Sequence, residues 1–352
     1  MKKELLIGTA LVSTLGAASV AEAVTATMSG NHQTGLEFDS PTGGSDTRAQ
    51  INDNNFTVSL SETTDGGMTI SSSFMLLNEA GGGSSDEDAG FSLAFTDGSK
   101  LDVLNAGNAS GSHDISIPGS AGAEGVTVTT GNTAPTGLDF MTGATVFGVE
   151  YHTAADFLAD GLKMSFSAST DNGAASSATY GMDNHFAFGG TYVTDLGDSA
   201  VTVGFGYSDS DGAKTGTQMT ADEGGIHVGV SAVTGDLTVA VGFADGDDIT
   251  STGTATNDVQ VDAEVVKAGV KYVSGDLTFN VGVASGTSQD SATAGTAGTT
   301  EDSKDVVSAS VSYAVASGVT AILGYTDVDS SDEGENDTTD GSAWYIGANM
   351  AF

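Results

Sequence analysis

One repeated pattern restricts the fold of this chain more than any other feature of its sequence. Apolar and small polar residues alternate in short segments, such as LTVAVGFADGD from Leu237 and LTFNVGVASG from Leu277. Successive side chains of a β-strand point to opposite faces, so Leu237, Val239 and Val241 share one face and the residues between them share the other. This alternation predicts strands that have one apolar side and one polar side.

The alternating segments form an internal repeat of strand pairs. Similar stretches begin at Gly197, Gly235, Gly275 and Ser317, close to forty residues apart, with a partner strand between each two. Short turns such as TGD and SGD join strands at one end, whereas long connections rich in Asp, Ser, Thr and Gly join them at the other. That organisation is typical of outer-membrane barrels.

Extending the count along the chain predicts about 16 strands, an even number, in an all-β, antiparallel, up-and-down transmembrane β-barrel. The expected strands lie near residues 24–32, 54–62, 67–77, 88–96, 99–106, 143–152, 160–169, 184–194, 199–208, 223–233, 236–244, 261–273, 276–285, 304–315, 318–327 and 342–352.

The apolar faces could pack inward in a soluble sandwich or propeller, or outward against lipid. The polar faces consist mainly of Gly, Ser, Thr and Asn, unlike the Lys- and Glu-rich exteriors of soluble sheets. A propeller repeat would need four strands, and this repeat has two. Six tyrosines also fall at or near strand ends, where headgroups favour an amphipathic ring, namely Tyr151, Tyr192, Tyr207, Tyr272, Tyr313 and Tyr325. These features favour lipid.

The first 23 residues have the layout of a secretory signal peptide: two lysines, an apolar stretch and the small-residue site Ala21-Glu22-Ala23. A membrane anchor or a buried helix is the alternative. Cleavage after Ala23 leaves residues 24–352 as one barrel domain. It removes two Lys and two Glu, so the net charge stays at −38. We expect export through the periplasm to the outer membrane of a bacterial cell.

Composition excludes several function classes. Nucleic-acid binding requires clustered Lys and Arg, and the only arginine is Arg48. The absence of Cys excludes disulfides and thiolate metal sites. The five histidines are scattered without a catalytic motif, so no enzyme is expected. His227 alternates with Ile226 and Val228, which predicts that its side chain points into the lumen.

The chain finishes in SAWYIGANMAF, in which Phe352, Met350 and Ile346 share one face. We expect that face to meet hydrocarbon, and we expect this strand to pair with the first one, because lipid does not tolerate open sheet edges. The terminal Phe352 also resembles the signature by which the barrel-assembly machinery recognises outer-membrane proteins. Filling a core is its alternative role.

The stretches FTVSLSETTDGGMTISSSFMLLNEAGGG and GFSLAFTDGSKLDVLNAG are similar to the second-to-fifth strand region of the alphaproteobacterial, Rhodobacter-type general diffusion porins. The resemblance covers essentially the whole mature chain. It implies a sixteen-stranded barrel, usually a homotrimer, that passes small hydrophilic solutes. The insertion at about residues 107–142 corresponds to the loop that such porins fold inward as a constriction.

The resemblance also suggests which residues line that constriction. Asp114, Glu124 and Asp139 are candidates for its acidic side, or else solvated loop charges. Relatives often carry arginine where this chain has Asn52-Asp53-Asn54-Asn55, so few basic residues are available for the opposite wall. The candidates are Arg48, Lys163, Lys267 and Lys271. A pore rich in carboxylates and poor in cations concentrates cations, which predicts cation selectivity.

Acidic loops offer oxygen ligands that suit Ca²⁺ or Mg²⁺, without the spacing of an EF-hand. Loose divalent binding there could bridge phosphates of lipopolysaccharide, although plain solvated loops explain the same residues, and no cofactor is required. The candidate ligands are Asp245, Asp247, Asp248, Asp332, Glu333 and Glu335. Two other functions stay open, a solute-selective channel of the same fold and a secreted β-rich adhesin without a pore.

Overall fold

A computed structural model of the chain describes ten stretches of the sequence. They are residues 24–42, 45–78, 90–104, 108–119, 148–170, 182–212, 222–251, 258–290, 300–331 and 340–352. The signal peptide expected at residues 1–23 lies outside these ranges. Among the described residues, no helix has the length and apolar character needed to cross a membrane.

The described residues form sixteen strands and one short 3-10 helix. They are β1 (Thr25–Pro41), β2 (Thr47–Thr63), β3 (Thr69–Asn78), β4 (Phe91–Ala94), β5 (Lys100–Val103), η1 (Gly111–His113), β6 (Gly148–His152), β7 (Leu162–Thr170), β8 (Met182–Leu196), β9 (Ser199–Gly212), β10 (Asp222–Thr234), β11 (Leu237–Ser251), β12 (Asp258–Ser274), β13 (Leu277–Asp290), β14 (Thr300–Ala316), β15 (Val319–Ser331) and β16 (Gly341–Ala351).

Each expected strand has a counterpart in the structure, which confirms the predicted barrel. The largest differences are in β1 and β2, which are 17 residues long where the sequence pattern indicated nine. Polar residues interrupt the alternation in both strands, for example Asn31-His32-Gln33 in β1 and Asn52-Asp53-Asn54-Asn55 in β2. The alternation rule therefore recognised only one end of each strand.

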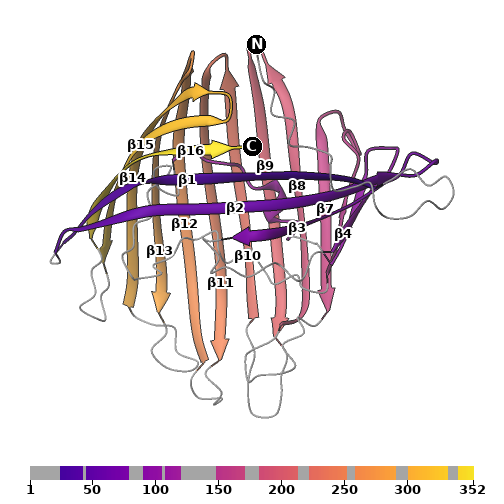
Figure 1. Ribbon diagram of the computed structural model, residues 1–352. Helices are drawn as coiled ribbons and strands as arrows, with labels where there is room; N and C mark the ends of the chain where they lie inside the picture. Colours follow the sequence, from indigo (N-terminus) through magenta and orange to yellow (C-terminus); the bar gives the residue numbers. More distant parts are fainter. Residues whose placement is uncertain are drawn as a thin grey trace, which may run out of the picture.

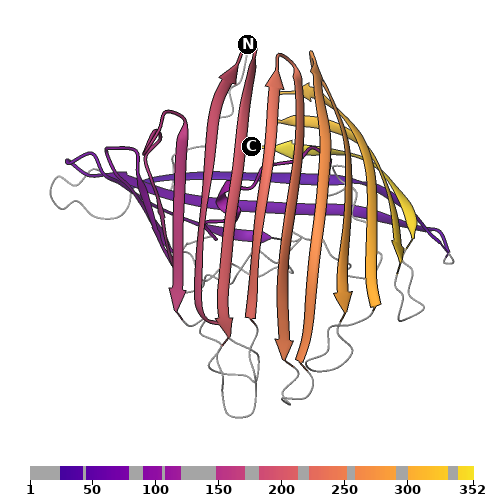
Figure 2. The ribbon, with the colours of Figure 1, turned by 180° about the vertical axis from the view of Figure 1, so that it is seen from behind.

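The strands close into one antiparallel barrel, in which each strand pairs with its neighbours in sequence and β1 pairs with β16. Backbone hydrogen bonds run in both directions between Gly30 and Phe352, at 3.1 and 3.2 Å. Figures 1 and 2 show β1 and β2 crossing one side of the barrel while β7 to β13 form the opposite side. The predicted pairing of the first and last strands is correct.

Tight turns join the strands at one end of the barrel. Between β10 and β11 the turn is Gly235-Asp236, and Gly235 has a φ of +57°. Two-residue hairpins need such left-handed backbone, which glycine adopts without steric cost. The opposite connections lie mostly outside the described residues.

The barrel exposes its apolar face and encloses its polar face. Val241, Val281 and Ile346 are 50 to 55% exposed on the outer surface. The side chains buried inside include many serines, threonines and ionisable groups. Among the residues that the structure describes, buried apolar side chains form one small cluster, Ala244 and Val265. This is the arrangement expected of a barrel whose outer wall meets lipid.

Candidate functional site

A segment of the long β5–β6 connection lies inside the barrel. We call residues 108–119 the inward loop segment, and η1 lies within it. At one end the amide of Ala109 donates to Oγ of Ser167 on β7, at 3.0 Å. At the other end the hydroxyl of Ser308 on β14 donates to the carbonyl of Gly119. The segment therefore follows the inner face of the wall from β7 to β14 and occupies part of the lumen.

Glycines on the wall allow the inward loop segment to approach this closely. At six positions an added Cβ would come within 3.0 Å of an atom of the segment, which real side chains essentially never do. Several of these glycines are directly paired across neighbouring strands, so they form a continuous shallow track. This glycine track consists of Gly189, Gly204, Gly206, Gly229, Gly269 and Gly282.

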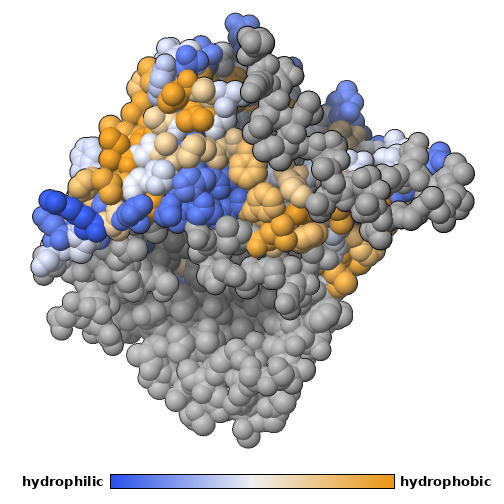
Figure 3. Space-filling model, viewed as in Figure 1, coloured by the Kyte–Doolittle hydropathy of each residue, from blue (hydrophilic) through white to orange (hydrophobic). Residues whose placement is uncertain are grey.

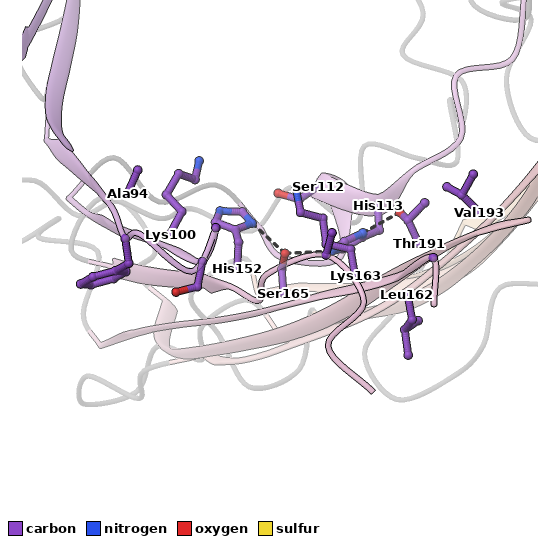
Figure 4. Close-up of a pocket in the computed structure, with 15 residues that line it drawn as sticks. Ala94, Lys100, Ser112, His113, His152, Leu162, Lys163, Ser165, Thr191 and Val193 are labelled. Carbon is purple, nitrogen blue, oxygen red and sulfur yellow. Dashed lines mark hydrogen bonds between the residues drawn. The ribbon is translucent and has the colours of Figure 1, made fainter. Parts of the chain in front are cut away.

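Polar contacts hold the beginning of the segment on β7 and β8. Nε2 of His113 lies 2.8 Å from Oγ of Ser165, and Nδ1 of His113 lies 2.7 Å from Oγ1 of Thr191. The Ser165 hydroxyl is also 2.7 Å from Nδ1 of His152 on β6. Figure 4 shows these side chains in a row along the wall, joined by dashed hydrogen bonds. His113 thus joins the beginning of the inward loop segment to two strands of the wall.

The environment of His113 keeps its ring neutral. Burial, together with the nearby His152, Lys163 and His227, lowers the pKa of His113 to about 4. A neutral imidazole has one N–H donor and one acceptor nitrogen. One consistent assignment has the Thr191 hydroxyl donating to Nδ1 of His113, while Nε2–H of His113 donates to Ser165.

The row of hydrogen bonds continues into an ionic cluster. Nε2 of His152 lies 2.9 Å from Oδ2 of Asp102 on β5, and the ammonium of Lys100 lies 2.7 Å from the same oxygen. Ser92 on β4 donates to the other oxygen of Asp102. Next to this cluster, Ser112 of the inward loop segment donates to Oε1 of Glu150 at 2.6 Å. The segment therefore contacts the cluster directly as well as through His113.

A second histidine holds the middle of the segment. The His227 side chain is buried, and its Nε2 donates to the carbonyl of Ser110 at 2.8 Å. Nδ1 of His227 has no hydrogen-bond partner among the described residues and lies 3.8 Å from Oδ1 of Asp114. The sequence prediction that His227 points into the lumen is correct.

A cavity of about 750 Å³ opens beside the ionic cluster. Its lining combines the basic side chains Lys100 and Lys163 with His113 and His152 and with apolar residues such as Val193. In Figure 4, Lys100, Ser112 and Val193 point into the open space, whereas Leu162 points away from it. The cavity leaves this part of the wall accessible to small solutes.

The structure places the predicted acidic residues only in part. Asp114 lies on the inward loop segment next to His227. Glu124 and Asp139 fall outside the described residues, as does most of the loop expected at about residues 107–142. On β1 and β2 alone, the sequence reasoning missed three inward carboxylates that are buried or half-buried, Glu37, Asp39 and Asp53.

The predicted basic wall needs one correction. Lys163, Lys267 and Lys271 alternate with outward-facing residues and lie on the inner face of β7 and β12. Arg48 does not, because it pairs with Phe38 across β1 and β2, and its guanidinium lies 5.8 Å from the centre of that exposed ring. The expectation that Arg48 lines the pore is therefore wrong, and Arg48 lies on the outer face.

The predicted divalent-ion ligands are also only partly described. The stretch from Asp245 to Asp248 belongs to strand β11 and not to a loop, which corrects the sequence interpretation. Asp245 lines an open cavity of about 490 Å³ together with Asp209 and Asp262. Asp332, Glu333 and Glu335 lie outside the described residues.

The sequence reasoning missed the cluster around His152 altogether. Glu150 and His152 are two residues apart in β6 and so share a face, which was the only local signal. Asp102, Ser165 and His113 come from three other segments, and only the register of short strands brings them together.

Comparisons with known proteins agree with this architecture. A family model described as Gram-negative porin matches residues 8–333. No curated protein matches the chain.

Three solved structures illustrate the structural similarity. OmpF of Salmonella typhi, in complex with daunomycin, has a TM-score of 0.62 and 14% identity over 93% of this chain and 97% of its own. In-vitro folded OmpT of Vibrio cholerae, in its trimer form, has a TM-score of 0.61 and 14% identity over 94% of this chain and 100% of its own. The anion-selective porin of Comamonas acidovorans has a TM-score of 0.61 and 11% identity over the same shares of the two chains, 94% and 100%. Identities this low show the fold alone.

Proposed function

The chain belongs to the Gram-negative porin family, and we propose that it forms a water-filled outer-membrane channel for passive diffusion of small hydrophilic solutes and ions, with a preference for cations. The observation that carries the proposal is the reversal of the two faces. Apolar side chains cover the outside, and polar side chains line the lumen. A barrel of sixteen strands is too wide for its inward side chains to fill. The inward loop segment narrows that lumen, so it sets the size of the solutes that pass.

The preference for cations rests on carboxylates at both sides of the lumen. Asp114 lies on the inward loop segment, which covers β7 to β14. Glu37, Asp39 and Asp53 lie on the inner face of β1 and β2, across the closed ring of strands. Asp53 occupies the stretch where the related porins often carry arginine. Together with a net charge of −38, this arrangement attracts cations and repels anions.

The selectivity is tested by the zero-current potential across a planar bilayer in a tenfold KCl gradient. We expect the sign of a cation-selective pore, and we expect the potential to fall in the isosteric variant Asp53→Asn because the variant removes a lumen charge. Asp236→Asn, in the tight turn between β10 and β11, is the matched control and should leave the potential unchanged. An anion-selective potential in the unmodified protein would contradict the proposal.

We also infer that the protein assembles as a homotrimer through the outer face of β1 and β2. On that face His32 and Asn54 form a hydrogen bond of 2.5 Å between neighbouring strands. Thr34, Asn52 and Gln50 continue the polar row on the same face. Figure 3 shows hydrophilic residues over β1 and β2 with hydrophobic residues around them. Amide and imidazole groups facing lipid are costly, so a protein partner is the better neighbour.

The double variant His32→Leu/Asn54→Leu tests this interface. If another subunit covers the patch, the variant loses a polar contact, and trimers should dissociate at a lower temperature on native gels. If the patch faces lipid, the apolar residues should leave the wild-type behaviour unchanged or stabilise the barrel, which would contradict the inference. Val281→Leu on the outer face of β13 is the control, with no change expected.

Four further expectations belong to the same proposal. The first 23 residues direct export through the periplasm. Phe352, exposed beside Phe56 on the outer face, is available to the barrel-assembly machinery. Ca²⁺ or Mg²⁺ binds loosely near Asp245 and bridges phosphates of lipopolysaccharide. A titration with millimolar Ca²⁺ that releases no heat would exclude this divalent contact. The resemblance to the Rhodobacter-type porins stays a prediction.

A further inference from the structure

Three side chains on the lumen wall bring metal-ligating atoms together. Asp102 on β5 and Glu150 on β6 are directly paired across the strands, and His152 follows two residues after Glu150 on the same face. One ligand atom from each of the three lies within 4.8 Å of the others. Nε2 of His152 is 2.9 Å from Oδ2 of Asp102 and 3.5 Å from Oε1 of Glu150.

These separations suit a small transition-metal ion. Zn²⁺ binds nitrogen and oxygen ligands at about 2.0–2.2 Å in tetrahedral geometry, which separates ligand atoms by roughly 3.3 Å. An imidazole with two carboxylates favours Zn²⁺ and its neighbours over Ca²⁺ and Mg²⁺, which prefer oxygen alone.

Neighbouring hydroxyl groups already orient each ligand. Nδ1 of His152 contacts the Ser165 hydroxyl at 2.7 Å, so Nε2 is the nitrogen that faces the two carboxylates. Ser112 donates to Glu150, and Ser92 donates to the Asp102 oxygen that His152 does not contact. Metal sites in proteins are supported by such outer contacts, which fix the ligand geometry before the ion arrives.

The charge of the cluster also favours a divalent ion. Asp102 and Glu150 are only 4% and 2% exposed, and burying two neighbouring carboxylates is costly unless cations compensate them. Lys100 contacts Asp102, but its side chain is 42% exposed and can turn into the adjacent cavity. That movement frees Oδ2 of Asp102. With the imidazole N–H on Nδ1, toward Ser165, Nε2 of His152 is the third donor atom for one ion.

We propose that Asp102, Glu150 and His152 form a binding site for one divalent transition-metal ion of the Zn²⁺ type on the lumen wall. The cavity lined by His152 and Lys100 gives the ion access from the lumen and leaves a fourth coordination position for water. Ion binding competes with the ammonium of Lys100 for Oδ2 of Asp102. The site does not depend on the selectivity or the trimeric state proposed above.

Calorimetric titration of the untagged, detergent-solubilised protein with ZnCl₂ tests the site. Millimolar Mg²⁺ in the buffer occupies the acidic surface groups that bind any divalent ion. We expect one saturable Zn²⁺ site, weakened at least tenfold in His152→Ala. The control His32→Ala removes an imidazole from the outer face and should bind Zn²⁺ as the wild type does.

Lys100→Ala gives the sharper test, because a metal site and a purely structural cluster predict opposite results. Removing the competing ammonium should tighten Zn²⁺ binding several-fold. If Lys100 only stabilises Asp102 and no ion binds there, the variant leaves the Zn²⁺ titration unchanged or weakens it, and the proposal is wrong. This comparison decides the question even if His152→Ala fails to fold, since the Lys100 side chain is 42% exposed and its truncation leaves the buried residues in place. Equal Zn²⁺ binding by wild type and a folded His152→Ala would likewise overturn the proposal.

Discussion

The imidazole of His113, on the inward loop segment, lies 2.8 Å from the hydroxyl of Ser165 on the barrel wall. This contact joins a loop to a strand more than fifty residues later in the chain. It makes this buried side chain one of the contacts that hold the loop in the lumen.

We therefore expect His113→Ala to loosen the inward loop segment. The substitution leaves the hydroxyl group of Thr191 without its ring partner and Ser165 with His152 alone, at a cost of about 1–3 kcal/mol in the free energy of unfolding. Single-channel recordings should show larger and noisier current steps than the wild type. Thr191→Ser keeps the hydroxyl and serves as the control, with steps of wild-type size. If the current steps of His113→Ala match those of the wild type in size and noise, other contacts hold the loop.

The lowered pKa of His113 predicts a dependence of stability on pH. The ring has a pKa of about 4 in the folded protein and an ordinary value of 6.5. Its contribution to stability is therefore complete above pH 6.5, falls as the pH drops from 6.5 to about 4, and changes no further below that. The charged groups that hold the pKa down are His152, Lys163 and His227.

Urea unfolding midpoints of the wild type and His113→Gln, measured between pH 4 and 7.5, isolate this effect from the titration of other groups. The wild type should lose more stability than the variant as the pH falls through this window. Parallel curves for the two proteins would show that His113 does not carry the dependence.

The glycine track predicts how the lumen can be widened. A Cβ atom at Gly269 would lie closer to the backbone of Pro118 than real Cβ atoms lie to their neighbours. Gly269→Val should therefore displace the inward loop segment from the wall and increase single-channel conductance and the rate of sugar uptake into liposomes. Ala268→Val, one residue away on the outer face, should leave both unchanged. Unchanged conductance in a folded Gly269→Val would mean that the wall bends and the loop stays.

The seam between β1 and β16 contains one wholly buried aromatic residue. Tyr345 lies over Gly35 and Gly347, and its hydroxyl donates to the carbonyl of Thr34 and accepts from Gln33. Tyr345→Phe leaves the amide of Gln33 without this acceptor and should reduce the free energy of unfolding by about 1–2 kcal/mol. Unfolding midpoints in urea measure the difference.

Tyr272→Phe provides the control, because that hydroxyl is on the exposed outer face and its loss should have little effect. A Tyr345→Phe protein as stable as wild type would show that ring packing alone holds the seam.

The alternation of the sequence predicted the barrel because it is a local property of each strand. The alternation alone places Leu277, Phe279 and Val281 on one face of β13, whichever strands pair with it. The same reasoning failed for Arg48 because β2 is polar on both faces around Asn52 and Asp53, which hides the alternation. Arg48 falls outside the strand expected at residues 54–62, so the pattern gave it no face, although β2 already begins at Thr47.

The site was less predictable because its residues meet only through the closed wall. Gly204, Gly229 and Gly282 look like ordinary small residues of polar faces until the inward loop segment is laid across them. Asp102 and His152 are fifty residues apart and come together through the pairing of two short strands. No spacing within the sequence encodes such contacts.

The joining of β1 to β16 has a consequence for biogenesis. The wall is complete only when Gly30 of β1 meets Phe352, which follows β16. A polypeptide that is still emerging from the ribosome lacks β16. Ring closure must therefore follow synthesis, and until then the borders of β1 and β15 stay unpaired.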